Sequence, residues 1–354
     1  MNRGEKCSKF CWSRSGGKSK LFLSVIVTAH DRKHLLLSAL ISVLSQKLDR
    51  SCYEIILVKN FIDSDLETLI NENNILTIFS NSNLGLKIKE GLKASQGEVV
   101  TFLEDDDLYE PERLSRIREV FMDDQSVVYY HNASCTIDEN GQKLEKNYYR
   151  AYNGIRLLDS SSLSGKELKE IHKFSVFNQL SSIAVRKNAF VSNADLVERI
   201  YVAADRFIFF SSVENGGRIF IDGNALTRYR FHDSLSNPIG DNNMLGVKVS
   251  MIASRKLEDY SIILSLRLSD GVLKLAYIGL LEAITEDRVF RSTRNAKRRE
   301  IIHLTFSLFY LSLSIGSFAY LKLSLVSFID SISHGLTRTL LTQHSEAKIK
   351  RMMH

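Results

Sequence analysis

The feature that most constrains this chain is an alternation of short apolar runs with helical patterns near its start. Four runs are short and rich in β-branched residues, which is typical of strands buried on both faces of a sheet. They are residues 21–28, 54–58, 75–79 and 99–103. Three segments with helical apolar spacing separate them: residues 33–46, 65–73 and 88–95. Successive βα units predict an α/β domain whose mostly parallel sheet is flanked by helices.

The α/β pattern continues to about residue 240. A helix is predicted from Pro111 to about residue 122, and another around residues 205–215. Three further strands are expected: residues 127–130, 181–185 and 218–221. Residues 138–180 are polar and have no clear periodicity, so we interpret them as a loop region over a substrate cleft.

We expect three parts in the chain: a basic flexible tail at 1–20, the α/β domain at 21–240 and a helical region at 241–354. Within the last part, residues 301–329 contain a single formal charge, Lys322. This length predicts either a membrane-associated helical segment or a buried helical hairpin, and we favour membrane association. Basic residues precede the segment, so the α/β domain is expected to face the cytoplasm.

The net charge of +6 is concentrated in the tail and in residues 288–299. Such clusters bind nucleic acid or anionic lipid equally well by charge alone. They lack interleaved aromatic residues and flank an apolar segment, so we expect a membrane and no nucleic acid. The four cysteines have neither disulfide nor zinc spacing and are expected to be reduced thiols. A secretory signal is not expected, because the first apolar run continues into a strand–helix pattern.

Four consecutive acids, Glu104, Asp105, Asp106 and Asp107, follow the fourth apolar run. Ligands in open α/β sheets bind beyond the carboxyl ends of strands. The four carboxylates repel one another there, and a cation would remove that cost. This acidic motif therefore predicts a metal site for a phosphorylated ligand. The alternative is that the acids only favour the N-terminus of the helix that Pro111 opens.

Other strand ends carry polar residues toward the same edge of the sheet. The first run leads into residues 28–32 (Thr-Ala-His-Asp-Arg), and the second ends in Lys59 and Asn60. Residues 83–85 (Asn-Leu-Gly) shape the loop before the third helical pattern, and Lys87 is available to a phosphate. We expect these segments to converge on one crevice.

Together these segments resemble glycosyltransferase family 2, the inverting nucleotide-sugar transferases with the GT-A fold. The resemblance covers roughly residues 21–240 and rests on several motifs in the family's order. These are SVIVTAHDR (24–32), EIILV (54–58), the Asn-x-Gly loop (83–85), Gly-Glu (97–98), the acidic motif, AADRFIFFSSVENGG (203–217) and TRYRFHDSLS (227–236).

The resemblance implies Mg²⁺ or Mn²⁺ held directly by Asp106, with Glu104 or Asp107 acting through water. His232 would complete the metal site or contact the diphosphate, supported by Arg230. Asp205 would be the catalytic base. The residues implied in donor binding are Thr28, Ala29, His30, Arg32, Asn60, Lys87 and Asp105. Taken without the motif, Asp205 would be a surface helix residue and His232 an ordinary, partly buried histidine.

The chain departs from the family where Lys59 and Asn60 stand, because many members have an aspartate pair there that contacts uracil. A uridine donor is therefore not carried over. The expected activity is metal-dependent, inverting sugar transfer to a glycan or lipid-linked acceptor at the cytoplasmic membrane face. The alternatives are a nucleotidyltransferase of related fold and a non-catalytic nucleotide-sugar-binding membrane protein. The first would need a Gly-rich loop after the first strand, and no glycine lies between Lys20 and Gly85.

Overall fold

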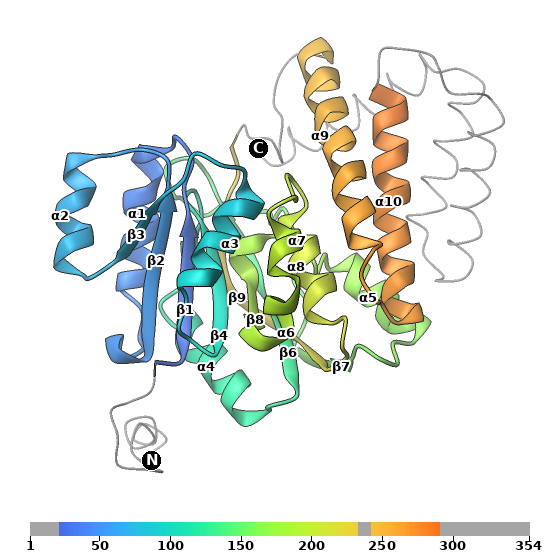
Figure 1. Ribbon diagram of the computed structural model, residues 1–354, viewed down its shortest axis with the longest axis horizontal. Helices are drawn as coiled ribbons and strands as arrows, with labels where there is room; N and C mark the ends of the chain where they lie inside the picture. Colours follow the sequence, from blue (N-terminus) through green and yellow to red (C-terminus); the bar gives the residue numbers. More distant parts are fainter. Residues whose placement is uncertain (1–20, 233–241, 291–354) are drawn as a thin grey trace.

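The computed structural model describes residues 21–232 and 242–290, and one nine-stranded sheet forms its centre (Figure 1). The strand order is β3-β2-β1-β4-β8-β6-β9-β5, and β7 pairs with β9. The strands are β1 (Leu23–Thr28), β2 (Tyr53–Lys59), β3 (Leu76–Phe79), β4 (Val99–Glu104), β5 (Leu108–Tyr109), β6 (Val127–Ile137), β7 (Ile155–Asp159), β8 (Ile183–Arg186) and β9 (Arg218–Arg230).

The first four predicted strands form the parallel part of the sheet, as expected. Strand β1 pairs in parallel with β2 and β4, and β2 pairs in parallel with β3. The rest of the sheet is mixed, because β8 runs antiparallel to both β4 and β6 while β6 and β9 are parallel. The prediction of a mostly parallel sheet is therefore correct only for its first half. Apolar patterns mark a strand but not its direction, so the sequence could not distinguish the two arrangements.

Helices cover both faces of the sheet (Figure 1). They are α1 (Lys33–Leu44), α2 (Ser64–Glu72), α3 (Leu84–Ala94), α4 (Arg113–Asp123), α5 (Gly165–Lys173), α6 (Lys187–Phe190), α7 (Ala194–Val197), α8 (Ala204–Ser212), α9 (Asn242–Ile263) and α10 (Asp270–Phe290). Successive side chains of β1 enter different clusters, Ile26 on one face and Val25 and Val27 on the other. The two cores explain why the β1 sequence is apolar without alternation.

Several elements extend beyond their predicted limits. Helix α3 begins at Leu84, earlier than expected, because the Asn83 side chain accepts a hydrogen bond from the Leu86 N–H at 2.8 Å. The region 138–180 is not only loop, since it contains β7 and α5. Helix α5 begins with a capping box between Ser164 and Glu167. Strands β6 and β9 are also longer than the predicted segments.

The helical region beyond residue 241 begins with α9 and α10, whose apolar residues join the same core cluster as those of α8. None of the helices in residues 21–232 and 242–290 has both the length and the apolar character needed to cross a membrane. The predicted tail at 1–20 and membrane-associated segment at 301–329 lie outside the described residues. Cys52 and Cys135 are buried free thiols.

Candidate active site at the carboxyl edge of the sheet

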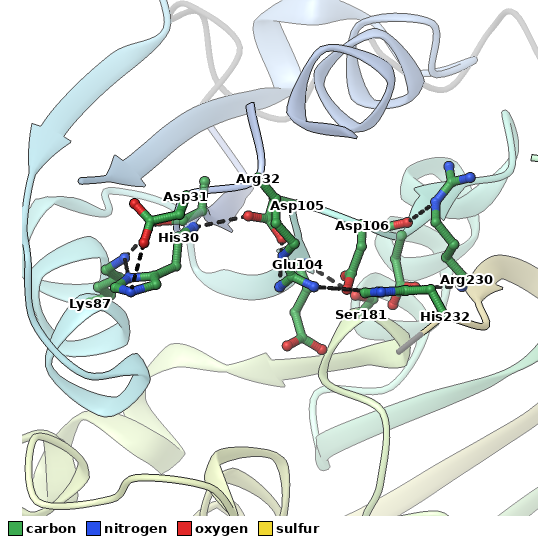
Figure 2. Close-up of polar contacts among 12 residues, drawn as sticks. His30, Asp31, Arg32, Lys87, Glu104, Asp105, Asp106, Ser181, Arg230 and His232 are labelled. Atoms are coloured by element: carbon green, nitrogen blue, oxygen red, sulfur yellow. Dashed lines mark hydrogen bonds and ion pairs between the residues drawn. The ribbon is translucent and has the colours of Figure 1, made fainter. Parts of the chain in front are cut away.

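The carboxyl ends of β1, β2 and β4 lie at the same level of the sheet. Thr28 at the end of β1 is in register with both Val58 and Glu104. The β1–α1 turn, Asn60 and the acidic motif therefore meet at one edge, as the sequence predicts. Figure 2 shows the side chains that gather there.

The turn after β1 is fixed by hydrogen bonds to its neighbours. The His30 N–H donates to Asp105 Oδ2 at 2.9 Å, and the Asp31 N–H donates to Asn60 Oδ1 at 3.1 Å. Asp31 has a φ of 61°, a left-handed conformation that aspartate tolerates better than most residues. Asn60 Nδ2 donates in return to Asp31 Oδ1 at 2.9 Å. The turn after β1 and Asn60 after β2, both predicted to bind the donor, are thus hydrogen-bonded to each other.

Lys87 is buried beneath this turn, with 2% of its surface exposed. Its ammonium donates to the Ala29 carbonyl at 2.6 Å and lies 3.1 Å from His30 Nδ1. Burial lowers the pKa of Lys87. The structure therefore places this lysine as a support of the turn, rather than on an exposed loop facing a phosphate.

Arg32 provides the positive charge next to the acidic motif. Its guanidinium pairs with Asp105 at 2.8 Å and with Asp106 (Figure 2). His232 Nε2 lies 2.8 Å from Asp106 Oδ2, so the imidazole and carboxylate converge as predicted. Burial opposes ionisation of Asp106, but the hydrogen bond with His232 and the Arg32 charge hold the pKa of this carboxyl below its ordinary value.

The neighbouring acids differ from Asp106. Burial raises the pKa of Asp105 to about 6, and burial with the Asp106 charge raises that of Asp107 to about 7. Burial, Asp106 and Asp107 raise the pKa of Glu104 well above its ordinary value. Asp106 is therefore the member of the motif whose pKa is lowered rather than raised.

Arg230 links the end of β9 to the acidic motif. Its backbone N–H donates to Asp107 Oδ1 at 2.9 Å, and its Nε donates to the Asp106 carbonyl at 2.7 Å. Its Nη1 donates to the carbonyls of Asp138 and Glu139 at 3.0 and 2.7 Å. Arg230 thus lies beside the motif, as predicted, and Asp107 accepts a backbone hydrogen bond.

Asp205 lies near the start of α8. Asp205 Oδ2 accepts the Gln179 N–H at 3.0 Å, and Oδ1 accepts the Arg206 N–H at 2.8 Å. Gln179 has a φ of 67°, which is unusual for a residue other than glycine. Burial raises the pKa of Asp205, although the Arg206 charge and the two N–H groups oppose that effect. A carboxylate with raised proton affinity fits a proton acceptor.

One short segment connects Asp205 to the acidic motif. Ser181 Oγ accepts the Glu104 N–H at 3.1 Å, while Gln179 binds Asp205. The α-carbons of Gln179 and Ser181 can be no more than about 7 Å apart, since one residue separates them in the chain. Asp205 therefore lies near the acidic motif, close enough for its charge to help raise the pKa of Glu104.

Gln179 and Ser181 are site residues that the sequence did not reveal. Gln179 lies in the polar region interpreted only as a loop, and Ser181 was assigned to a strand without a role. A third residue that the sequence did not reveal is Tyr149, whose pKa is raised by burial and by the charges of Tyr148, Asp205, Asp107 and Glu104. Its ring centroid lies 4.9 Å from Tyr148 and 5.2 Å from Tyr229. No motif in the sequence marks these residues.

Residues 24–185 match the family model described as glycosyl transferase family 2. An uncharacterized glycosyltransferase of Rickettsia bellii (strain RML369-C) is 26% identical over 137 residues, which are 37% of this chain and 19% of that protein. The uncharacterized glycosyltransferase alr2836 of Nostoc sp. is 31% identical over 131 residues, which are 35% of this chain and 40% of that protein. The chain thus spans less than half the length of either relative.

Two crystal structures of S. aureus TarS are similar in fold. Residues 1–349 of TarS in complex with UDP-GlcNAc superpose with a TM-score of 0.52 at 16% identity, covering 92% of each chain. A longer TarS structure gives a TM-score of 0.50 at 15% identity, covering 88% of this chain and 54% of that one. The match of residues 24–185 and the two curated relatives therefore support a glycosyltransferase similar to glycosyl transferase family 2.

Proposed function

We propose that this chain transfers a sugar from a nucleoside-diphosphate sugar to a hydroxyl group, with inversion at the anomeric carbon. The observation that carries the proposal is the segment 179–181, which accepts a hydrogen bond from Glu104 through Ser181 and donates one to Asp205 through Gln179. An inverting transfer needs a proton acceptor opposite the leaving diphosphate, so these two groups must share a site. The match of residues 24–185 to the glycosyl transferase family 2 model supports the same reaction class.

The donor would lie on the turn after β1, with Thr28, Ala29, His30, Arg32, Asn60 and Asp105 around its nucleoside and Lys87 supporting the turn. Binding of UDP-GlcNAc by the similar TarS structure supports a nucleotide-sugar donor. Lys59 is buried and paired with Glu67, leaving Asn60 at the sheet edge. The amide of Asn60 both donates and accepts hydrogen bonds, whereas a carboxylate only accepts them, so the base of the donor is left open.

The donor set at the acidic motif suits Mg²⁺ or Mn²⁺ in its chemistry. Asp106 and His232 converge within 2.8 Å, and Asp106 favours its ionised form. No group of three or more histidine, cysteine or acidic side chains with metal-binding geometry is found in residues 21–232 and 242–290. We assign Asp106 and His232 as the protein ligands, Glu104 and Asp107 as groups acting through water, and Arg230 as a support. When bound, the ion would neutralise the leaving diphosphate.

Asp205 would remove the proton from the acceptor hydroxyl. Its raised pKa favours proton uptake, and its two backbone hydrogen bonds fix both oxygens. The Arg32 guanidinium, which pairs with Asp105 and Asp106 here, is free to meet a diphosphate once a cation balances those acids. The protein thus supplies a proton acceptor and a counter-charge on separate elements.

The acceptor proposed is a lipid-linked or cell-surface glycan precursor at the cytoplasmic membrane face. The sequence supports this location through the basic cluster at 288–299 and the apolar segment at 301–329. Flotation of the full chain with anionic vesicles tests the location. Binding that survives removal of residues 301–329 would contradict that segment's role.

The donor is identified by calorimetric titration of uridine, guanosine and thymidine diphosphate sugars with and without Mn²⁺. One donor class should bind in a Mn²⁺-dependent way, and NMR of the sugar product should show an inverted anomeric configuration. Asp123→Asn is a suitable control, since Asp123 is exposed at the end of α4, away from the site. Absence of cation-dependent binding for all three classes would contradict the proposal.

A further inference from the structure

Helices α9 and α10 lie outside the residues that match the family model, yet α9 contacts α8 and α10 contacts α5 (Figure 1). Their apolar residues share a core cluster with Phe207 and Phe210 of α8. We infer that α9 and α10 complete the active site and that Asp259 of α9 is a positioning residue for Asp205. This inference rests on the proposed role of Asp205 as the base.

Asp259 caps the start of α8 from another helix. Its carboxylate is fully buried: Oδ1 accepts the Tyr201 N–H at 2.9 Å, and Oδ2 accepts those of Val202 and Ala203 at 2.8 Å each. The N-cap residue of α8, Ala203, has no side chain that could accept these hydrogens. A helix start leaves such donors unsatisfied, and negative charge is favourable there. Asp259 therefore anchors the backbone two residues before Asp205.

Arg206, the residue that follows Asp205, also contacts α9 and α10. Arg206 Nη1 donates to Tyr260 Oη at 2.5 Å and lies 3.7 Å from Glu282 Oε2. Glu282 Oε1 in turn lies 3.1 Å from His172 Nε2 on α5. The Arg206 Nε donates to Asn178 Oδ1 at 3.1 Å, next to the residue whose N–H binds Asp205. The Arg206 charge is thus directed toward Glu282, and Asp205 keeps its backbone partners.

The two helices approach closely enough for this contact because of a glycine. A Cβ added to Gly279 of α10 would lie 1.7 Å from Tyr260 Oη and 2.2 Å from its Cζ. Tyr260 is 1% exposed, so its ring has little room to move aside. The packing of α9 against α10 therefore sets where the Tyr260 hydroxyl meets Arg206.

These contacts hold Asp205 from both sides. The helix start is fixed by Asp259, the following residue by Tyr260 and Glu282, and the carboxylate itself by Gln179. A displacement of about 1 Å in a catalytic group can cost roughly 100-fold in rate. Loss of the Asp259 contacts should therefore reduce turnover without changing the donor site, which lies on β1, β2 and β4.

The test compares Asp259→Asn with Glu258→Gln, a matched loss of charge on the same helix at a side chain that is 60% exposed. The probe is UDP-GlcNAc with Mn²⁺ and water as the acceptor, and the UDP released together with free GlcNAc gives kcat and KM. We expect Asp259→Asn to lower kcat by roughly 10- to 100-fold with KM within about twofold of wild type. Hydrogen exchange at residues 201–205 should also become faster. The control should match the wild-type chain in both measurements.

A second, milder variant covers the case in which Asp259→Asn does not fold. Tyr260→Phe keeps the ring and removes only the acceptor of the Arg206 hydrogen bond, and we expect a smaller loss of kcat with unchanged KM. If either folded variant retains wild-type kcat and exchange while Asp205→Asn loses turnover, the inference is wrong and the proposed function stands. If Asp205→Asn retains turnover, the proposed base is wrong and the inference falls with it.

If the wild-type chain does not turn over this probe, hydrogen exchange at residues 201–205 is the test. Faster exchange in Asp259→Asn supports the anchoring role of Asp259, and unchanged exchange overturns it.

Discussion

The two halves of the candidate site are stabilised in different ways. In the acidic motif, charged side chains face one another: Arg32 pairs with Asp105 and Asp106, and His232 meets Asp106. Asp205 instead accepts hydrogen bonds from backbone N–H groups. The first half holds ionised groups that a cation or diphosphate can rearrange. The second half holds one acid whose proton affinity is raised by burial.

The two halves also come from different parts of the chain. Most of the acidic half comes from residues at the ends of β1 and β4. The Asp205 half is assembled from residues 179, 205 and 259, which lie on three separate segments. Binding of the donor and removal of the proton are therefore expected to respond to different substitutions.

The largest effects are expected from Asp106→Asn and Asp205→Asn. Each should lower sugar transfer by roughly 10³-fold, since removal of acid–base catalysis costs about 10²–10⁴. Asp106→Asn should also abolish Mn²⁺ binding, because it removes the carboxylate assigned to the ion. Asp205→Asn should leave Mn²⁺ and donor binding within about twofold of wild type, as measured by calorimetry. Equal losses of donor affinity in both variants would contradict the claim that Asp205 acts on the proton and not on donor binding.

The pH dependence of turnover should report Asp205 together with Asp105 and Asp107, whose pKa values are raised to about 6 and about 7. Burial raises the pKa of Asp205 above the ordinary value for aspartate, about 3.9. Turnover should rise with pH through the raised value and fall about tenfold for each unit below it. A profile that is flat down to pH 4 would contradict the role of Asp205 as a base.

The same shift predicts a stability effect with a definite sign. An acid whose pKa is raised by folding contributes stability that is present below its unfolded pKa and is lost as pH rises through the folded pKa. In urea unfolding, the wild-type chain should therefore gain stability relative to Asp205→Asn as the pH falls through the raised pKa of Asp205. A stability difference that does not change with pH would contradict the raised pKa.

Arg32→Gln should have a smaller effect, confined to the acidic half. The substitution removes the charge next to Asp105 and Asp106, so the free energy of unfolding should fall by about 1–3 kcal/mol without divalent ions. Added Mn²⁺ should restore most of this loss, because it supplies the missing charge. Thermal melts with Mn²⁺ and with EDTA measure both values. Equal destabilisation with Mn²⁺ and with EDTA would show that Arg32 and the cation do not act at the same site.

The smallest effect is expected from Lys59→Met. Lys59 is buried and pairs with Glu67, which is 38% exposed. The lysine therefore acts on stability, by about 1 kcal/mol or less, and not on the donor. Donor affinity measured by calorimetry should stay within about twofold. A tenfold loss would place Lys59 in the donor site.

The sequence predicts the acidic half well, because strand periodicity and the order of motifs place Thr28, Asn60 and Asp106 at one edge. Parallel strands bring their carboxyl ends together without further information. The strand order beyond β4 was not predictable, since β8 and β9 have the same apolar pattern in either direction. Gln179 was missed because its role depends on a left-handed backbone within a polar loop.

Asp259 was missed for a related reason. In the sequence it is one acid on an amphipathic helix, and its backbone partners lie more than fifty residues earlier. Nothing local distinguishes it from Glu258, which is exposed. Asp107 likewise accepts a hydrogen bond from the backbone of Arg230, which lies more than a hundred residues later.

The central claim is that Asp106 and Asp205 act on the same substrate in one site. It is tested most directly by adding Mn²⁺ to isotope-labelled protein and recording the backbone amide signals of Ala204 and Asp205. Paramagnetic broadening of these signals in the wild-type chain, and its loss in Asp106→Asn, is the predicted result. If the two signals stay sharp while Mn²⁺ binds at Asp106, the proposed base does not share the cation's site.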